Sequence, residues 1–104
     1  MPVLAVGELR LDPAARTVHY GDIPIELTPK EFALLEALMR RPGEAVSRFD
    51  LLECAWDDSY DNRSNVVDVY IGYLRNKIDK PFEQKLIHTR RGAGYQMSAS
   101  MDEG

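Results

Sequence analysis

The stretch from Asn65 to Tyr95 constrains the fold more than any other part of the chain. Apolar residues recur at helical spacing in its first half and predict a helix with one buried side. These residues are Val67, Tyr70, Ile71, Leu74 and Ile78. A second side mixes small, amide and aromatic groups where a solvated helix would carry Glu and Lys. Its members are Asn65, Asp68, Val69, Gly72, Tyr73 and Asn76.

A β-hairpin signal follows this helix. A β-prone run ends in Arg90 and Arg91, Gly92-Ala93-Gly94 supplies a turn, and a second run begins at Tyr95. A helix with a readable outer side and an arginine-tipped hairpin together suit a DNA groove and its flanking phosphates. The stretch therefore predicts a DNA-binding winged helix.

Length and composition indicate one globular domain. The chain has 104 residues and is 44% hydrophobic, and it contains no run of about 18 apolar residues that could cross a membrane. Its first residues do not follow the pattern of a secretory signal. Cys54 is the one cysteine, which fits a reducing cytoplasm, and its apolar helical surroundings predict a buried, inert thiol.

The total charge of the chain is negative, but the charged residues are unevenly distributed along it. The formal net charge is −4, which by itself argues against a nucleic-acid binder. Residues 63–95, however, carry seven Lys and Arg against three Asp and Glu, a balance of +4. Residues 1–62 carry six against twelve, a balance of −6. The positive charge is confined to the helix-and-hairpin stretch, although chance asymmetry would look the same in so small a protein.

The remaining elements predict an α+β fold in one domain. Residues 3–27 read as three or four short antiparallel strands, and Pro24 favours an edge strand. Residues 28–78 read as three helices, residues 86–97 as the hairpin and residues 98–104 as a tail. Thr28, Pro29 and Glu31 form a capping-box helix start. Val46 is expected to add a β bridge, and Ser47 to cap the second helix.

An acidic, turn-prone loop joins the second and third helices. Because its side chains would repel phosphate, it is a solvated connector or a contact for a protein partner. The loop residues are Asp57, Asp58, Ser59, Tyr60, Asp61 and Asn62.

Four segments in this order and spacing resemble the winged-helix effector domains of OmpR/PhoB-type response regulators of bacterial two-component systems. The segments are LTPKEFALLEALMRRPGEAVSR from Leu27, LLECAW from Leu51, VVDVYIGYLRNKI from Val66 and IHTRRGAGY from Ile87. The resemblance covers nearly the whole chain. It implies a four-stranded antiparallel N-terminal sheet, three helices with a small strand after the first, and a C-terminal hairpin wing.

The resemblance also implies function and partners. It implies sequence-specific binding to bacterial promoter DNA, with helix 64–78 in the major groove and hairpin 87–97 at the minor groove. Family members usually bind as head-to-tail pairs on direct repeats, and the loop at residues 57–61 can contact RNA polymerase. A sensor histidine kinase would act on a receiver domain that these residues lack, so the chain looks like the output half of a longer cytoplasmic regulator.

The candidate DNA contacts fall into two groups. The major-groove candidates are Arg63, Asn65, Asp68, Val69, Gly72, Tyr73, Arg75 and Asn76. The backbone and minor-groove candidates are Lys77, Thr89, Arg90, Arg91 and Gly92. Many family members carry base-reading arginines where this chain has Gly72 and Tyr73, so the target motif does not transfer. An amide prefers adenine, a carboxylate can accept from cytosine, and Val69 can sit against a thymine methyl.

Structural roles compete with several of these assignments. Arg75 and Lys77 could stabilise a helix C-terminus instead of binding phosphate. Asp68 could bond to Arg63 or Arg75 rather than a base. Arg90 could pair with an acid, and Gly72, which costs about 1 kcal/mol against alanine in a helix, could reflect drift.

Catalysis and metal binding find no support in the sequence. His19 and His88 lie in separate segments with no Cys or carboxylate at metal-ligand spacing, and RRGAGY lacks the context of a phosphate-binding loop. We expect no enzyme and no cofactor. The competing interpretation is a winged helix that binds protein, which a contiguous apolar patch over Val69, Tyr73 and the hairpin would favour.

Overall fold

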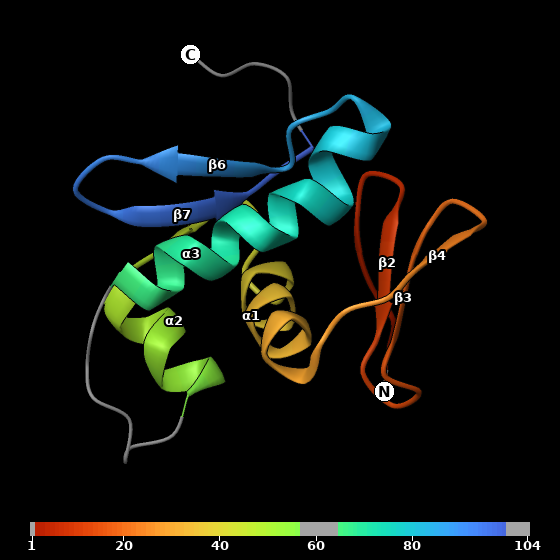
Figure 1. The fold of residues 1–104 in the computed structure, drawn as a ribbon, viewed down its shortest axis with the longest axis horizontal. Helices are drawn as coiled ribbons and strands as arrows, with labels where there is room; N and C mark the ends of the chain where they lie inside the picture. The colour runs from red at the N-terminus through yellow and green to blue at the C-terminus, as the bar shows by residue number, and fades with distance from the viewer. Residues whose placement is uncertain (1, 57–64, 100–104) are drawn as a thin grey trace.

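In the described part of the chain, the fold consists of two antiparallel sheets and three α-helices (Figure 1). The computed structural model describes residues 2–56 and 65–99. In Figure 1 the N-terminal sheet lies at one end of the molecule. The C-terminal hairpin lies along the third helix in this view, and its second strand also packs against the first helix. The α+β winged-helix architecture predicted from the sequence is confirmed.

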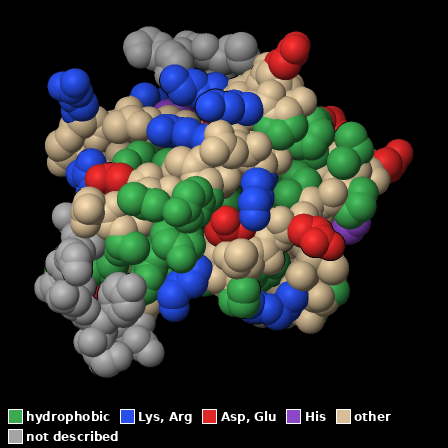
Figure 2. All heavy atoms as spheres, in the orientation of Figure 1, with side chains coloured by type: hydrophobic (Ala, Val, Ile, Leu, Met, Phe, Trp, Pro, Cys, Tyr) green, Lys and Arg blue, Asp and Glu red, His purple; other side chains and the backbone are tan. Residues whose placement is uncertain are grey.

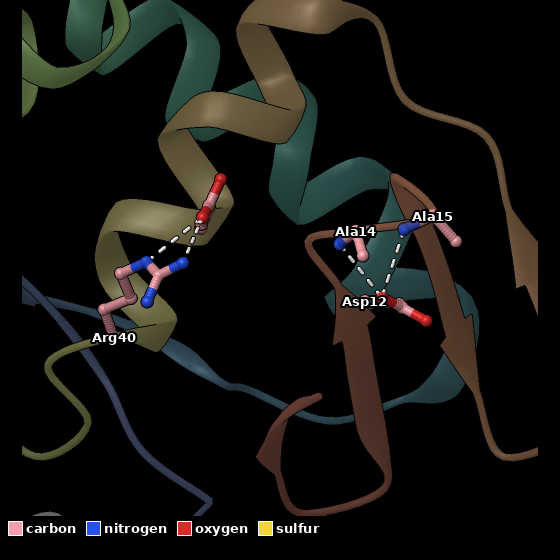
Figure 3. Close-up of polar contacts among 5 residues, drawn as sticks. Asp12, Ala14, Ala15 and Arg40 are labelled. Atoms are coloured by element: carbon pink, nitrogen blue, oxygen red, sulfur yellow. Dashed lines mark hydrogen bonds and ion pairs between the residues drawn. The ribbon is translucent and has the colours of Figure 1, made fainter. Parts of the chain in front are cut away.

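The N-terminal sheet has four strands in the order of the chain, β1-β2-β3-β4. Its strands are β1 (Leu4–Val6), β2 (Leu9–Asp12), β3 (Thr17–Tyr20) and β4 (Ile23–Ile25). Leu9, Leu11 and Val18 point into the core, and the predicted edge position of Pro24 is confirmed because β4 is the outer strand. The Asp12 carboxylate closes the β2–β3 turn by accepting bonds from the amides of Ala14 and Ala15 at 3.0 and 3.1 Å (Figure 3).

Helix α1 (Pro29–Met39) begins as the sequence predicts. The Thr28 hydroxyl accepts from the Glu31 amide, and the Glu31 carboxylate accepts from the Thr28 amide at 2.9 Å. Beyond the last turn, Arg40 pairs with Glu36 at 2.7 Å (Figure 3). The apolar side of α1, which includes Leu34 and Leu35, is fully buried.

The short strand β5 (Ala45–Val46) and helix α2 (Arg48–Ala55) follow. Ser47 caps α2 by accepting from the Asp50 amide at 3.0 Å, as predicted. The prediction of a buried Cys54 is wrong, because its side chain is exposed. Leu51 and Trp56 take the inward positions of this helix and leave Cys54 on the solvent side.

The predicted third helix changes its hydrogen bonding partway along. Helix α3 (Asn65–Leu74) continues into a π-helical turn (Arg75–Asp79) and a short 3-10 turn (Lys80–Phe82). Val67, Ile71, Leu74 and Ile78 are buried, as their spacing predicts. The Lys80–Phe82 turn thus extends helical structure past residue 78, where the third helix was predicted to end.

The hairpin consists of β6 (Ile87–Arg90) and β7 (Gly94–Met97). The predicted bridge at Val46 forms, since β5 pairs with β7 and completes a three-stranded sheet in the order β5-β7-β6. Among the described residues, no helix is long and apolar enough to cross a membrane.

Candidate nucleic-acid interface

One side of α3 is left uncovered by the rest of the fold. Val69 and Tyr73 keep 44% and 46% of their surface exposed, and Asn65 and Asn76 at either end are also exposed. Neither asparagine makes a side-chain hydrogen bond within the described residues. In Figure 2 hydrophobic side chains gather over the first turns of α3, and Lys and Arg side chains lie over the neighbouring hairpin. We call the side formed by Asn65, Val69, Gly72 and Tyr73 of α3 and by Asn76 of the following π-helical turn the outer face of α3.

The ring of Tyr73 is oriented by a series of aromatic contacts. Buried Trp56 meets Tyr70 edge-on at 5.2 Å between ring centroids, and Tyr70 meets Tyr73 edge-on at 5.1 Å. Edge-to-face pairs at this separation are attractive. Tyr70 therefore links the exposed Tyr73 ring to Trp56 in the core.

Gly72 lies in the middle of the outer face. A Cβ built on it would meet no atom within 4 Å, so packing inside the protein does not require glycine here. Glycine in a helix interior costs roughly 1 kcal/mol against alanine. Its presence is consistent with a surface that something outside the molecule approaches closely.

Asp68 points away from this face, toward α2 and β7. One of its carboxylate oxygens accepts from Arg48 Nε at 2.8 Å and from the Tyr95 hydroxyl. Arg48 is therefore its described ion-pair partner, where the sequence suggested Arg63 or Arg75. Three elements, α2, α3 and β7, meet at this carboxylate.

The electrostatics of this cluster favour a charged aspartate. Partial burial raises the pKa of Asp68, but the hydrogen bonds from Tyr95 and Arg48 outweigh burial and leave the pKa below its ordinary value. The hydrogen bond to Asp68 raises the pKa of Arg48. Burial, and then the bond to Asp68, raises the pKa of Tyr95. The cluster is therefore held as carboxylate, guanidinium and neutral phenol at neutral pH.

Arg75 connects the helix to the hairpin. Its Nη2 donates to the Ile87 carbonyl and to the Thr89 hydroxyl, both at 2.9 Å, and its Nε donates to the same carbonyl at 3.3 Å. Its guanidinium also lies 5.7 Å from the centre of the Tyr95 ring. The sequence offered a phosphate or base contact, or helix-dipole stabilisation, for Arg75, and the structure adds a further role in fixing β6 against α3.

Lys77 is bound to the first helix. Its ammonium donates to Glu31 at 2.7 Å, and Glu31 is only 4% exposed. The same carboxylate oxygen accepts from the Thr28 amide, so Lys77 neutralises the glutamate of the α1 capping box. Lys77 was predicted to contact the DNA backbone, and this ion pair draws its ammonium toward α1.

The two arginines at the hairpin tip, Arg90 and Arg91, differ in their contacts. Arg90 Nε donates to Gln96 across the hairpin at 2.5 Å. Arg91 is exposed and makes no hydrogen bond or ion pair with the residues that the structure describes. Gly92, at φ +79°, makes the turn that leaves Arg91 projecting. Thr89 is exposed on β6 but already accepts from Arg75.

Two supporting residues were missed by the sequence reasoning. Asp79 is 5% exposed, and its two oxygens accept from the amides of Leu86 and Ile87 at 3.0 and 3.3 Å. Burial raises the pKa of Asp79, against the lowering effect of those two bonds. Arg48 was treated only as part of a motif. No local pattern announces either role, because each partner is distant in the sequence.

The remaining candidates lie outside the described residues. These are Arg63 and the loop residues Asp57, Asp58, Ser59, Tyr60 and Asp61. Within residues 2–56 and 65–99, no group of three or more His, Cys, Asp and Glu side chains is placed to hold a metal ion.

Comparison with known proteins gives a consistent result. The family described as "Transcriptional regulatory protein, C terminal" matches residues 22–97. The transcriptional regulatory protein TcrA of Mycobacterium tuberculosis is 55% identical over 96 residues, which is 92% of this chain and 38% of TcrA. The response regulator MprA of Mycolicibacterium vanbaalenii is 44% identical over 92 residues, 88% of this chain and 40% of MprA. The chain thus spans about two fifths of these curated relatives.

A solved structure gives the same match in three dimensions. The DNA-binding domain of RstA from Klebsiella pneumoniae, solved in complex with the RstA box, superposes with a TM-score of 0.82 at 31% identity. The match covers 96% of this chain and the whole of that domain.

Proposed function

The chain belongs to the winged-helix DNA-binding output domains of OmpR/PhoB-type response regulators, and on that premise we propose that it binds promoter DNA through α3 and the β6–β7 hairpin. It is a transcription-regulating domain of a non-enzymatic family. The outer face of α3 enters the major groove, and the hairpin tip reaches the phosphates and the adjacent minor groove. RstA, whose domain was solved with its DNA box, supports this arrangement by analogy.

The observation that carries the proposal is the contrast between Arg91 and the other cations of this region. Arg48, Arg75 and Lys77 are held by internal acceptors, whereas Arg91 projects from the hairpin with no described partner. An exposed guanidinium without a partner contributes nothing visible to folding and is well suited to phosphate. Arg48 keeps 44% of its side chain exposed, so a second backbone contact can form beside its bond to Asp68.

Further partners are proposed from the family. The chain pairs head-to-tail with a second copy on direct repeats, and the acidic loop at residues 57–61 contacts RNA polymerase. A sensor histidine kinase controls the regulator through a receiver domain. Because promoter DNA is the ligand, the site of action is the cytoplasm.

The alternative of a protein-binding winged helix is the weaker one. Val69 and Tyr73 do form an exposed apolar area, as that alternative requires. The hairpin beside it nevertheless presents Arg91, so the area is bordered by positive charge rather than by further apolar surface.

Selection from a random duplex pool tests the DNA-binding proposal. We expect enrichment of two short direct repeats about one helical turn apart, which is the spacing at which two copies meet the same side of the duplex. A single short motif would refute pairing by this chain alone. No enrichment at low salt would refute the DNA-binding proposal and favour the protein-binding alternative.

Arg91→Ala tests the role of the hairpin. The variant should bind the selected duplex more weakly, and the slope of log affinity against log salt concentration should fall by about 1. Thermal unfolding should not change, since Arg91 has no described partner to lose. Arg10→Ala removes another exposed arginine, on the distant N-terminal sheet, where its guanidinium donates to the Gly7 and Leu9 carbonyls, and it should leave the slope intact. Equal binding by Arg91→Ala and wild type at every salt concentration would contradict the proposed contact.

A further inference from the structure

We propose that the outer face of α3 reads thymine methyl groups and adenine edges, so that A·T pairs rather than guanines specify the target half-site. This inference rests on the proposed DNA binding and adds the base class that the helix recognises.

The first step is the absence of a guanine reader on the described part of the helix. The commonest guanine contact is an Arg or Lys that bonds to O6 and N7. Arg75 donates to the Ile87 carbonyl and Thr89, and Lys77 donates to Glu31. Both cations of residues 65–79 are therefore turned toward the protein. Arg48, on the adjoining helix, is held by Asp68.

The second step is what the same face offers instead. Val69 presents its methyl groups at 44% exposure, and the neighbouring Tyr73 ring is 46% exposed. Apolar side chains in the major groove contact the C5-methyl of thymine, which no other base carries there. The Trp56–Tyr70–Tyr73 contacts hold the aromatic edge of this surface in place, so the apolar surface is preformed.

The third step concerns the two amides. Asn65 and Asn76 are exposed, lie at opposite ends of the outer face, and make no side-chain hydrogen bond within the described residues. An asparagine amide can donate to N7 of adenine and accept from its N6 amino group. Between the two amides lies Gly72, with open space above its Cα. A base pair can therefore approach the helix axis closely at the centre of the face.

Asp68 does not supply a competing contact in this arrangement. Its carboxylate accepts from Arg48 and Tyr95 through one oxygen, which turns it toward α2 and β7. Both donors bind the same oxygen and hold the carboxylate away from the outer face, so its second oxygen is not presented to the bases there. The amides of Asn65 and Asn76 are exposed on that face and need no such reorientation.

Base analogues in the selected duplex test this inference directly. Each thymine of the half-site is replaced in turn by uracil, which removes only the C5-methyl group. Each guanine is replaced in turn by 7-deazaguanine, which removes only the N7 acceptor. We expect at least one uracil substitution to weaken binding about fourfold, the value of one buried methyl group. No deazaguanine substitution should weaken binding by more than about twofold, because both cations of residues 65–79 are held inside the protein and neither can make the paired N7/O6 contact.

A matched pair of variants assigns the effect to the helix. Val69→Ala should bind thymine and uracil duplexes equally, because the methyl contact is already lost. Val3→Ala, which removes the same atoms from a valine that is 50% exposed and lies just before β1, should keep the fourfold preference.

The outcomes separate this inference from the proposed function. Binding that depends on guanine N7 and ignores the thymine methyl would overturn the inference while leaving DNA binding in place. A thymine preference that survives in Val69→Ala would also overturn it. The absence of any selected duplex would refute the proposed function, and the inference with it.

Discussion

The helix and the hairpin of the candidate interface differ in how they use positive charge. In the last turns of the third helix, Arg75 donates hydrogen bonds to β6, and Lys77 pairs with Glu31 of the α1 capping box. At the hairpin tip Arg91 has no described partner. The difference supports the proposed division of roles, in which the hairpin would attract the DNA backbone and the helix would present a neutral surface to the bases. Cations of equal formal charge are therefore not equal candidates for DNA contact.

Gly94→Ala should disrupt the hairpin, and its effect should be the largest of these substitutions. Gly94 has φ +121°, and a Cβ there would lie 2.0 Å from the Val46 carbonyl oxygen, which is backbone and has little room to shift. We expect a loss of about 3 kcal/mol or more in the free energy of unfolding, measured by chemical denaturation.

Gly92→Ala is the matched control for Gly94→Ala. Its φ is also positive, at +79°, but its Cβ would meet no atom. It should lose only about 1–2 kcal/mol, the cost of a left-handed conformation. Equal losses for the two variants would mean that contact between Gly94 and β5 does not limit the fold.

Substitutions of Arg75, which joins the third helix to the hairpin, should have an intermediate effect on stability. Arg75→Met removes the bonds to Ile87 and Thr89 and should cost about 1–3 kcal/mol of stability. Arg75→Lys keeps the charge but loses the planar fork of donors, so it should be destabilised nearly as much. Denaturation curves of both variants measure this. Full stability in both variants would show that the bonds to Ile87 and Thr89 do not hold the hairpin, and would restore the phosphate-contact interpretation.

Gly72→Ala should have the smallest effect, and its sign differs between folding and binding. An added Cβ meets no protein atom, so the free energy of unfolding should rise by about 0.5–1 kcal/mol. If DNA approaches the helix at Gly72, affinity for the selected duplex should fall at the same time. A variant that is more stable and binds equally well would show that DNA does not approach the outer face at this point.

Much of the architecture could be predicted because it depends on neighbours in the sequence. The capping box of Thr28 and Glu31 spans three residues, and the burial of Val67 and Ile71 follows from helical period. Cys54 shows where that reasoning fails. Its apolar neighbourhood suggested burial, but the helix orientation that places Leu51 and Trp56 inward leaves Cys54 outside.

The sequence by itself determined the order of the elements, the buried side of the third helix and the glycine turn that leaves Arg91 at the hairpin tip. The tertiary structure decided which charged groups remain available to a ligand. Lys77 meets Glu31 across 46 residues, and Asp68 meets Tyr95 across 27. Such pairs form only when packing brings distant elements within hydrogen-bond reach, so no local pattern can distinguish Lys77 from Arg91.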